Sequence, residues 1–388
     1  MKKNLLSLLF IASIILPVAA MTDSEWQTMK REALERQRKI IVDNDGDDFS
    51  GSIPMNESVN IDKQMAIRTS FMHKYPVDTI VYSVTYGSFD QLFVPTKDGI
   101  TWAYAKPNQK NILQELLKMG TDPIKLQLEY CKKHNIEFWA GFRINDTHDA
   151  GDRPDKPWPG FPESKRKNPH LLIGSYENQP PHATWSSWDF THKEIRDKFA
   201  NIVIDVAKNY EVDAVYIDLY RWLGIFKSVG WGAEASDSER EMFSDMLRKI
   251  RRETEKIGRA RQKPILFAIR VPDSIGYSRA VGFDWENLMK EGVFDIVIAA
   301  DNHHLQYWGK SAELCHKYGV KCYPSISMPC FVSLPRLYRH DRRSYFAREA
   351  AALAAGMDGL FFFNVFEEPM IKAVVPESFA ALQTYDKR

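Results

Sequence analysis

Cysteine, net charge and long apolar runs are all scarce in this chain of 388 residues. None of its four cysteines forms a C-x-x-C pair, so the sequence predicts no cysteine zinc site. Cys315, Cys322 and Cys330 lie close enough in sequence to allow one disulfide, and buried free thiols fit equally well. The 52 basic and 51 acidic residues nearly cancel, which gives no basic footprint for nucleic acid. No segment after residue 20 is apolar for long enough to span a membrane.

Several functional motifs are missing as well. There is no repeat of fixed period, and no G-x-G-x-x-G or Walker loop follows a strand. No H-x-H pair, as a zinc or binuclear hydrolase barrel would carry, lies on the first expected strand. The acidic segment 43–48 resembles half of a calcium loop, but its glycine comes one residue early and no bidentate glutamate follows at the right offset. We therefore assign no metal and no cofactor.

The first twenty residues have the pattern of a secretory signal peptide. Lys2 and Lys3 precede an apolar run over 5–16, and small residues at Val18 and Ala20 suit cleavage after Ala20. The run is too short for a membrane anchor. We expect residues 1–20 to be removed, the protein to be exported to the periplasm or the medium, residues 21–38 to form a tail or one helix, and residues 39–388 to form the catalytic domain.

Eight short apolar runs alternate with amphipathic stretches along the remaining chain. The runs are nearly continuous rather than alternating, as in strands that are covered on both faces. Eight strands separated by helices predict an α/β fold, a single (β/α)8 TIM barrel, with an open doubly wound sheet as the alternative. The expected strands cover 39–42, 79–84, 137–142, 214–219, 264–269, 294–299, 320–326 and 360–365, and the expected helices cover 123–134, 193–208, 239–257, 285–289, 312–318 and 343–355.

One connection is much longer than the others. Between the third and fourth strands the segment 145–190 is rich in Pro, Gly, His, Asn and aromatic residues and has little periodicity. Loops of this length in a compact domain are usually functional.

Carboxylates gather where the expected strands end. In a barrel of this type the active site lies at the carboxyl ends of the strands, so residues far apart in sequence should share one mouth. Like charges collected in this way are costly unless they are paired, protonated or used in catalysis. The strand-end residues that we single out are Asp45, Arg143, Asp146, His148, Asp218, Arg221, Arg270, Asp301, His303 and Glu367.

Aromatic residues are the outlier in the composition, with 10 Trp, 16 Tyr and 22 Phe. Most tryptophans follow strands rather than lie within them. Since sugar rings have apolar C–H faces and polar edges, tryptophans with a rim of Asp, Asn, Arg and His match a carbohydrate, although any single tryptophan is as easily explained by loop packing. Trp185, Trp188, Trp222 and Trp308 are the candidate contacts, and Trp102, Trp158 and Trp231 have similar positions.

These residues fit glycoside hydrolysis, which needs one carboxylic acid to protonate the leaving oxygen and one carboxylate to attack carbon or activate water. Asp218 lies inside an apolar run, where an unpaired carboxylate is costly, and we assign it as nucleophile or base. Asp301 is assigned as the acid and Glu367 as a substitute for either. The other polar candidates would hold hydroxyls or an anionic group. A structural salt bridge from Asp218 to Arg143, Arg221 or Arg270 is the alternative.

Three segments resemble exported glycoside hydrolases of the glycosyl-hydrolase-like family ten type. They are residues 40–48, 142–149 and 213–221. The D-G-x-x-x-D pattern of such families appears at the fourth strand with Ala214 in place of its glycine and with the second aspartate present as Asp218. The resemblance implies a barrel that acts on glycans.

Two other classes of function stay open. The chain could be a glycan-binding barrel without catalysis, or a metal-dependent hydrolase or polysaccharide lyase. Asp218→Asn should abolish turnover if the protein is a hydrolase, and it should leave binding intact in both the hydrolase and the glycan-binding barrel. Loss of activity with a chelator would favour the metal-dependent hydrolase, and an unsaturated product that absorbs in the ultraviolet would favour the lyase.

Overall fold

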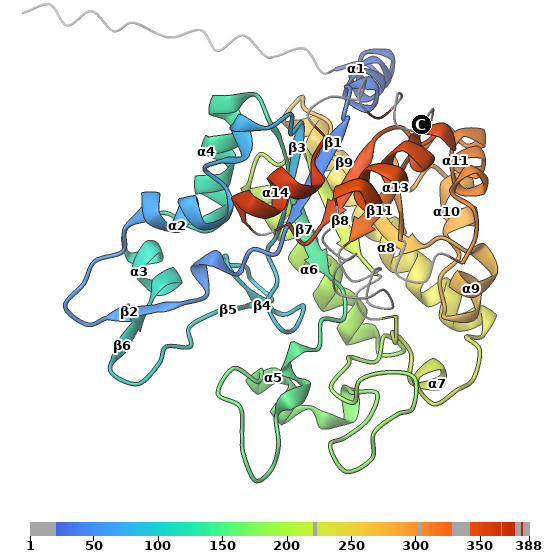
Figure 1. The fold of residues 1–388 in the computed structure, drawn as a ribbon. Helices are drawn as coiled ribbons and strands as arrows, with labels where there is room; N and C mark the ends of the chain where they lie inside the picture. The colour runs from blue at the N-terminus through green and yellow to red at the C-terminus, as the bar shows by residue number, and fades with distance from the viewer. Residues whose placement is uncertain are drawn as a thin grey trace, which may run out of the picture.

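The computed structural model describes residues 21–219, 223–300, 305–327, 342–365, 367–376 and 382. Eight parallel strands form a closed barrel (Figure 1), which confirms the predicted fold. The first strand pairs with both the second and the last strand of the barrel, so the open sheet is excluded. In chain order the barrel strands are β1 (Ile40–Asn44), β3 (Thr79–Ser83), β7 (Glu137–Arg143), β8 (Ala214–Asp218), β9 (Leu266–Pro272), β10 (Ile296–Ala300), β11 (Lys321–Ser327) and β12 (Leu360–Phe363).

Each predicted apolar run forms one of these strands, because one face packs on the helices and the other fills the barrel. The inward-facing residues form a cluster of their own inside the barrel. Because side chains alternate between the two faces of a strand, the residue two positions after an interior residue also points inward, and at the carboxyl ends of several strands that residue is polar. The interior cluster includes Ile41, Val81, Trp139, Tyr216, Ala268, Ile298, Tyr323 and Phe361.

The outer helices begin and end at local signals. Asp122 caps α4 (Pro123–His134), which ends at Asn135 in the left-handed conformation with φ of 55°. Ser236 and Glu239 form a capping box at the start of α8 (Asp237–Ala260). The remaining helices are α1 (Asp23–Glu35), α2 (Ile61–Arg68), α3 (Ile112–Lys118), α5 (Glu163–Lys167), α6 (Lys193–Asn209), α7 (Lys227–Gly230), α9 (Ile275–Ala280), α10 (Trp285–Lys290), α11 (Trp308–Lys317), α13 (Arg342–Ala354) and α14 (Glu368–Val374).

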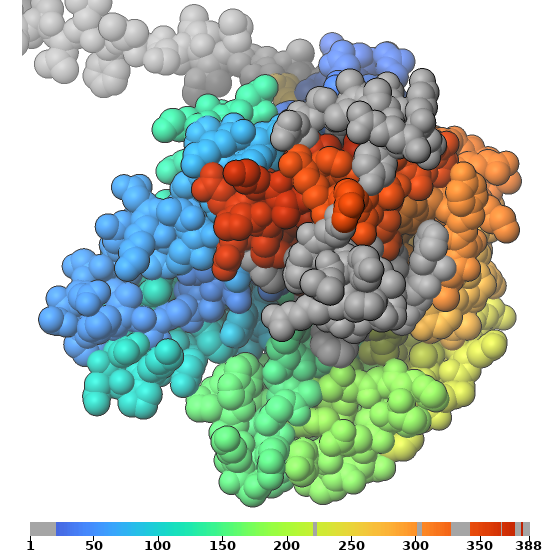
Figure 2. Space-filling model, viewed as in Figure 1, coloured from blue at the N-terminus to red at the C-terminus, as the bar shows by residue number. Residues whose placement is uncertain are grey.

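Long excursions leave the carboxyl end of the barrel. Those after β1 and β3 form two small sheets: β2 (Ser52–Pro54), which follows β1, pairs with β6 (Gln109–Asn111), and β4 (Gln91–Leu92) pairs with β5 (Ile100–Thr101) within the excursion after β3. The other follows β7 and contains α5. In Figure 1, α1 lies at one end of the barrel and α5 and α7 lie at the other, and Figure 2 shows the segment after β7 as a green lobe.

The amino end of the barrel is closed by a buried ion pair. Arg38 donates to Glu137 through Nε at 2.5 Å and Nη2 at 2.8 Å, and its side chain is fully buried. The same guanidinium donates to the carbonyl oxygens of Ala33 at 2.6 Å and Leu34 at 3.1 Å in α1. Arg38 therefore joins the first helix to the floor of the barrel.

Cys131, Cys315 and Cys322 are free and buried, as the thiol alternative expected; Cys330 lies outside the described residues. Among the helices that the structure describes, none is long and apolar enough to span a membrane.

Candidate active site

Asp218 lies at the carboxyl end of β8 inside the barrel, against Arg270 of β9. The Arg270 Nη1 atom is 3.4 Å from Oδ1 and 3.3 Å from Oδ2 of Asp218, and both side chains are buried. Arg270 also donates from Nε to Ser325 Oγ of β11 at 3.0 Å, and its guanidinium lies 3.8 Å from the ring centroid of Phe363 in β12. One arginine thus spans the barrel interior and balances the charge of the leading catalytic candidate.

Arg143 makes a second bridge across the mouth, at the end of β7. It forms ion pairs with Asp45, which follows β1, and with Asp146 at 3.5 Å, and it donates to Asn364 Oδ1 at 3.2 Å. Asn364 directly follows β12 and has a φ of 58°, a left-handed conformation that is uncommon outside glycine. Residues from β1, β7 and β12 therefore meet at this guanidinium.

His148 extends this network toward solvent. Its Nδ1 contacts Asp146 Oδ1, and its backbone N–H donates to the same oxygen at 3.1 Å. The Asp146 side chain is buried, whereas the imidazole is half exposed. A buried carboxylate that orients an exposed imidazole provides a proton-transfer group or a hydroxyl-binding group at the mouth.

Tyr216 lies two residues before Asp218 on β8 and was not predicted as a site residue. Burial raises the pKa of its hydroxyl well above the usual range, and the carboxylates of Asp218 and Asp43 raise it further. Within the described residues this hydroxyl has no hydrogen-bond partner. Tyr216, Ser325 and Phe363 could have been found from strand alternation, which places each of them on the same inner face as a predicted site residue.

The acidic segment after β1 is folded tightly against β3. The Tyr82 hydroxyl lies 2.7 Å from Asp48 Oδ1 and 2.9 Å from the carbonyl oxygen of Gly46, while Arg68 pairs with Asp47. Gly46 has a φ of 79°, and a Cβ there would lie 2.0 Å from the Ser83 carbonyl oxygen, so only glycine fits. Burial raises the pKa of Asp48 to about 7.

We expect the Asp48 carboxyl to lower stability as pH rises from about 4 to about 7. In this interval the unfolded chain releases the proton while the folded protein retains it, so the free energy of unfolding falls. Asp48→Asn should remove this loss and should be more stable than wild type at pH 8 by about 2–4 kcal/mol, because one pKa unit corresponds to about 1.4 kcal/mol. Urea unfolding at pH 4 and pH 8 tests this, and parallel pH profiles for the two proteins would refute it.

The segment after β7 has a small core of its own, which holds two of the predicted tryptophans. Lys165 Nζ contacts Asp149 Oδ2 at 2.5 Å, with both side chains fully buried. Trp188 is 2% exposed and donates to Ser88 Oγ at 3.1 Å, and Trp185 stacks on Phe161 with ring centroids 5.6 Å apart. Trp185 and Trp188 are therefore packed within this segment, with 8% and 2% of their surfaces exposed.

Two further candidates lie where helices begin. Glu367 is exposed at the start of α14, near the carboxyl end of β12. Trp308 is buried at the start of α11, where the guanidinium of Arg348 lies 5.4 Å from its ring. Four candidates lie outside the described residues, namely Asp301, Arg221, Trp222 and His303.

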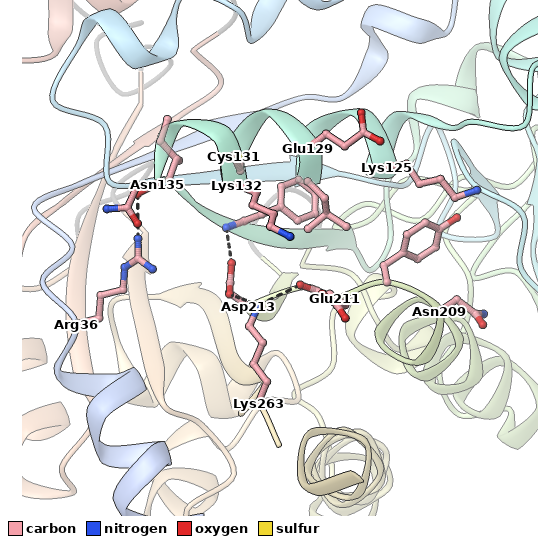
Figure 3. Close-up of a pocket in the computed structure, with 14 residues that line it drawn as sticks. Arg36, Lys125, Glu129, Cys131, Lys132, Asn135, Asn209, Glu211, Asp213 and Lys263 are labelled. Carbon is pink, nitrogen blue, oxygen red and sulfur yellow. Dashed lines mark hydrogen bonds and ion pairs between the residues drawn. The ribbon is translucent and has the colours of Figure 1, made fainter. Parts of the chain in front are cut away.

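A pocket of about 500 Å³ lies at the opposite end of the barrel (Figure 3). It is lined by residues that precede strands or end helices, including Arg36, Cys131 and Lys263, and Lys263 Nζ contacts Asp213 at 2.7 Å. Burial raises the pKa of the Cys131 thiol, which disfavours the nucleophilic thiolate. Because the amino end of such barrels carries stability rather than catalysis, we do not place the active site there.

No protein-family model and no curated protein matches the sequence. The structure is similar to α-L-fucosidase isoenzyme 2 from Paenibacillus thiaminolyticus, with 11% identity and a TM-score of 0.55 over 90% of this chain and 50% of that chain. It is also similar to the PgaB (BpsB) glycoside hydrolase domain from Bordetella bronchiseptica, with 10% identity and a TM-score of 0.52 over 87% of this chain and 95% of that chain. This chain thus spans half the length of the fucosidase. At such identities the likeness shows the fold alone.

Proposed function

We propose that the protein is an exported glycoside hydrolase that cleaves glycosidic bonds of a poly- or oligosaccharide at the carboxyl end of the barrel. The observation that carries the proposal is the position of Asp218, a buried carboxylate at the end of the fourth barrel strand, paired with Arg270, which in turn contacts Ser325 of β11 and Phe363 of β12. A purely structural ion pair would not need the second polar bridge of Arg143, Asp45, Asp146 and Asn364 across the same mouth.

In this proposal Asp218 attacks the anomeric carbon or activates a water molecule, while a second carboxyl group protonates the leaving oxygen. Asp301 is the proposed acid, with Glu367 as its substitute. Arg143, Asp146 and His148 bind hydroxyl groups beside the cleaved bond. The proposed signal peptide, residues 1–20, delivers the protein outside the cytoplasm, where polymeric glycans are found.

The proposal is tested by incubating the mature protein with plant, algal and host glycans and identifying the products by mass. Saturated sugars whose masses sum to that of the substrate plus one water molecule per cleaved bond support hydrolysis. An unsaturated product absorbing in the ultraviolet would replace the proposal by a lyase, and loss of activity with a chelator would replace it by a metal-dependent enzyme. Binding without any product would indicate a glycan-binding barrel.

A further inference from the structure

An aromatic cleft lies beside the mouth, between the excursions that follow β3 and β7. Its volume is about 490 Å³. Trp102 and Tyr104 line one side, and Trp158 and Phe161 line the other. Both sides belong to connections at the carboxyl end of the barrel, so the cleft opens on the same end as Asp218. It is formed by two of the tryptophans that the sequence singles out but that the proposed catalytic site does not use.

The cleft is held in shape by hydrogen bonds and close packing. Gln91 Nε2 donates to the carbonyl oxygen of Gly160 at 2.9 Å and joins the two excursions, while Trp102 Nε1 donates to the carbonyl oxygen of Ser50 at 2.9 Å. The rings of Trp102 and Trp158 are 6.5 Å apart. A Cβ on Gly160 would lie 2.6 Å from Trp158 and 3.0 Å from Trp102, so glycine allows both indoles to converge there.

The chemistry of the lining matches a neutral sugar ring. Tyr104 is 37% exposed and Trp158 is half-buried, so aromatic surface is available in the cleft. Gln91 also lines the cleft, and its amide is held by the hydrogen bond to Gly160. The guanidinium of Arg166 is paired with Asp152 at 2.7 Å and therefore demands no anionic ligand.

Tyr86 connects the cleft to the barrel mouth. Its ring packs edge-on against Trp102 with centroids 4.5 Å apart. Burial raises the pKa of Tyr86, and the carboxylates of Asp47 and Asp146 raise it further, which places the ring within electrostatic reach of both. Asp146 in turn pairs with Arg143. The aromatic lining thus runs outward from the polar groups of the mouth.

We propose that this cleft binds a neutral pyranose unit of a glycan chain whose cleaved bond lies at Asp218, an outlying subsite that makes the protein prefer chains over single sugars. The inference rests on the proposed function. Tyr104 supplies an exposed aromatic face, and Trp158 supplies part of the opposite wall.

The test compares wild type with Tyr104→Ala, and Tyr104→Phe is the matched control that keeps the ring. Calorimetric titrations use cellohexaose, xylohexaose, maltohexaose and mannohexaose, with hexagalacturonate as the charged comparison. We expect at least one neutral chain to bind. For that chain Tyr104→Ala should weaken binding by roughly three- to tenfold, the range expected for one aromatic contact, and Tyr104→Phe should bind as wild type does.

The opposite results overturn the inference. These are binding of no neutral chain, tighter binding of hexagalacturonate, or equal affinities for wild type and Tyr104→Ala. For a chain that is cleaved, Tyr104→Ala should raise KM, whereas KM for an aryl monoglycoside, which reaches only the mouth, should not change; an equal rise for both would indicate a structural role. Binding that depends on Tyr104 without cleavage would refute the proposed function alone, and cleavage that does not depend on Tyr104 would refute the subsite alone.

Discussion

Asp218→Asn should lower the rate of glycan cleavage by about 10²–10⁴-fold, the usual contribution of a group that transfers protons or activates water, or by more if Asp218 is the nucleophile. The amide has nearly the same shape but carries no negative charge with which to attack carbon or activate water. Initial rates on the glycan identified in the product screen measure the effect, with binding of the same glycan measured in parallel. Binding should persist, because the polar bridge around Arg143 is unchanged.

Asp213→Asn is the matched control for this variant. Asp213 directly precedes the same strand, β8, and accepts a hydrogen bond from the Phe138 amide at 2.9 Å at the opposite end of the barrel. It should therefore leave the rate unchanged. Circular dichroism and thermal unfolding of both variants separate loss of chemistry from loss of folding. Wild-type rates for folded Asp218→Asn would show that the ion pair with Arg270 is structural only.

Adding azide to Asp218→Gly identifies the role of the carboxylate. If Asp218 is the nucleophile or the base, azide should occupy the vacated space, attack the anomeric carbon from that face and give a glycosyl azide of inverted anomeric configuration. If Asp218 is instead the acid/base of a retaining enzyme, azide should displace the other carboxylate from the glycosyl-enzyme intermediate and give the same configuration as the substrate. The configuration of the sugar released by wild type then separates the first two roles, because a nucleophile gives retention and a base gives inversion. No rescue, together with wild-type rates for Asp218→Asn, would move the catalytic role to another carboxylate.

Glu137→Ala should destabilise the fold by about 3–5 kcal/mol, the usual cost of removing one partner of a buried ion pair. The change leaves the Arg38 guanidinium without its two carboxylate contacts in a fully buried position. It also removes the acceptor of the Thr79 hydroxyl at 3.1 Å. Urea unfolding followed by tryptophan fluorescence measures the loss.

Glu253→Ala is the matched control for Glu137→Ala, since it removes the same atoms from an exposed pair. Glu253 contacts Lys256 at 2.7 Å on the surface of α8. Surface pairs of this kind contribute about 0–1 kcal/mol, so the control should remain close to wild type. Equal losses of unfolding free energy in the two variants would mean that burial does not increase the contribution of the Arg38–Glu137 pair to stability.

The barrel was predictable because its signals are local. Runs such as 79–84 and 214–219 are apolar on both faces, and caps such as Asp122 mark where helices begin. Helix α11 begins at Trp308, four residues before the predicted start. The inward-packed Trp308 does not interrupt the helix, but it adds little to the 3.6-residue periodicity from which the start was predicted.

The contacts within the site were not predictable in the same way. The sequence offered Arg143, Arg221 and Arg270 as partners for Asp218. The strand register places both Arg143 and Arg270 opposite Asp218, and it is the structure that shows the ion pair with Arg270. Trp185 and Trp188 were expected to contact sugar, yet whether a loop tryptophan faces outward depends on long-range neighbours such as Ser88, which lies 100 positions from Trp188. Pattern and composition contain no such information.

The closure of the barrel has a consequence for how the protein is made. β1 pairs with β12, and Ile40 lies opposite Leu360, so the first strand finds one of its two neighbours only near the end of the chain. Until synthesis reaches β12, the nascent chain exposes an unpaired strand edge, which favours aggregation. The high contact order also slows the final step. We therefore expect the barrel to close only after β12 has been synthesised, and the unclosed intermediate to be the form that holdase chaperones bind.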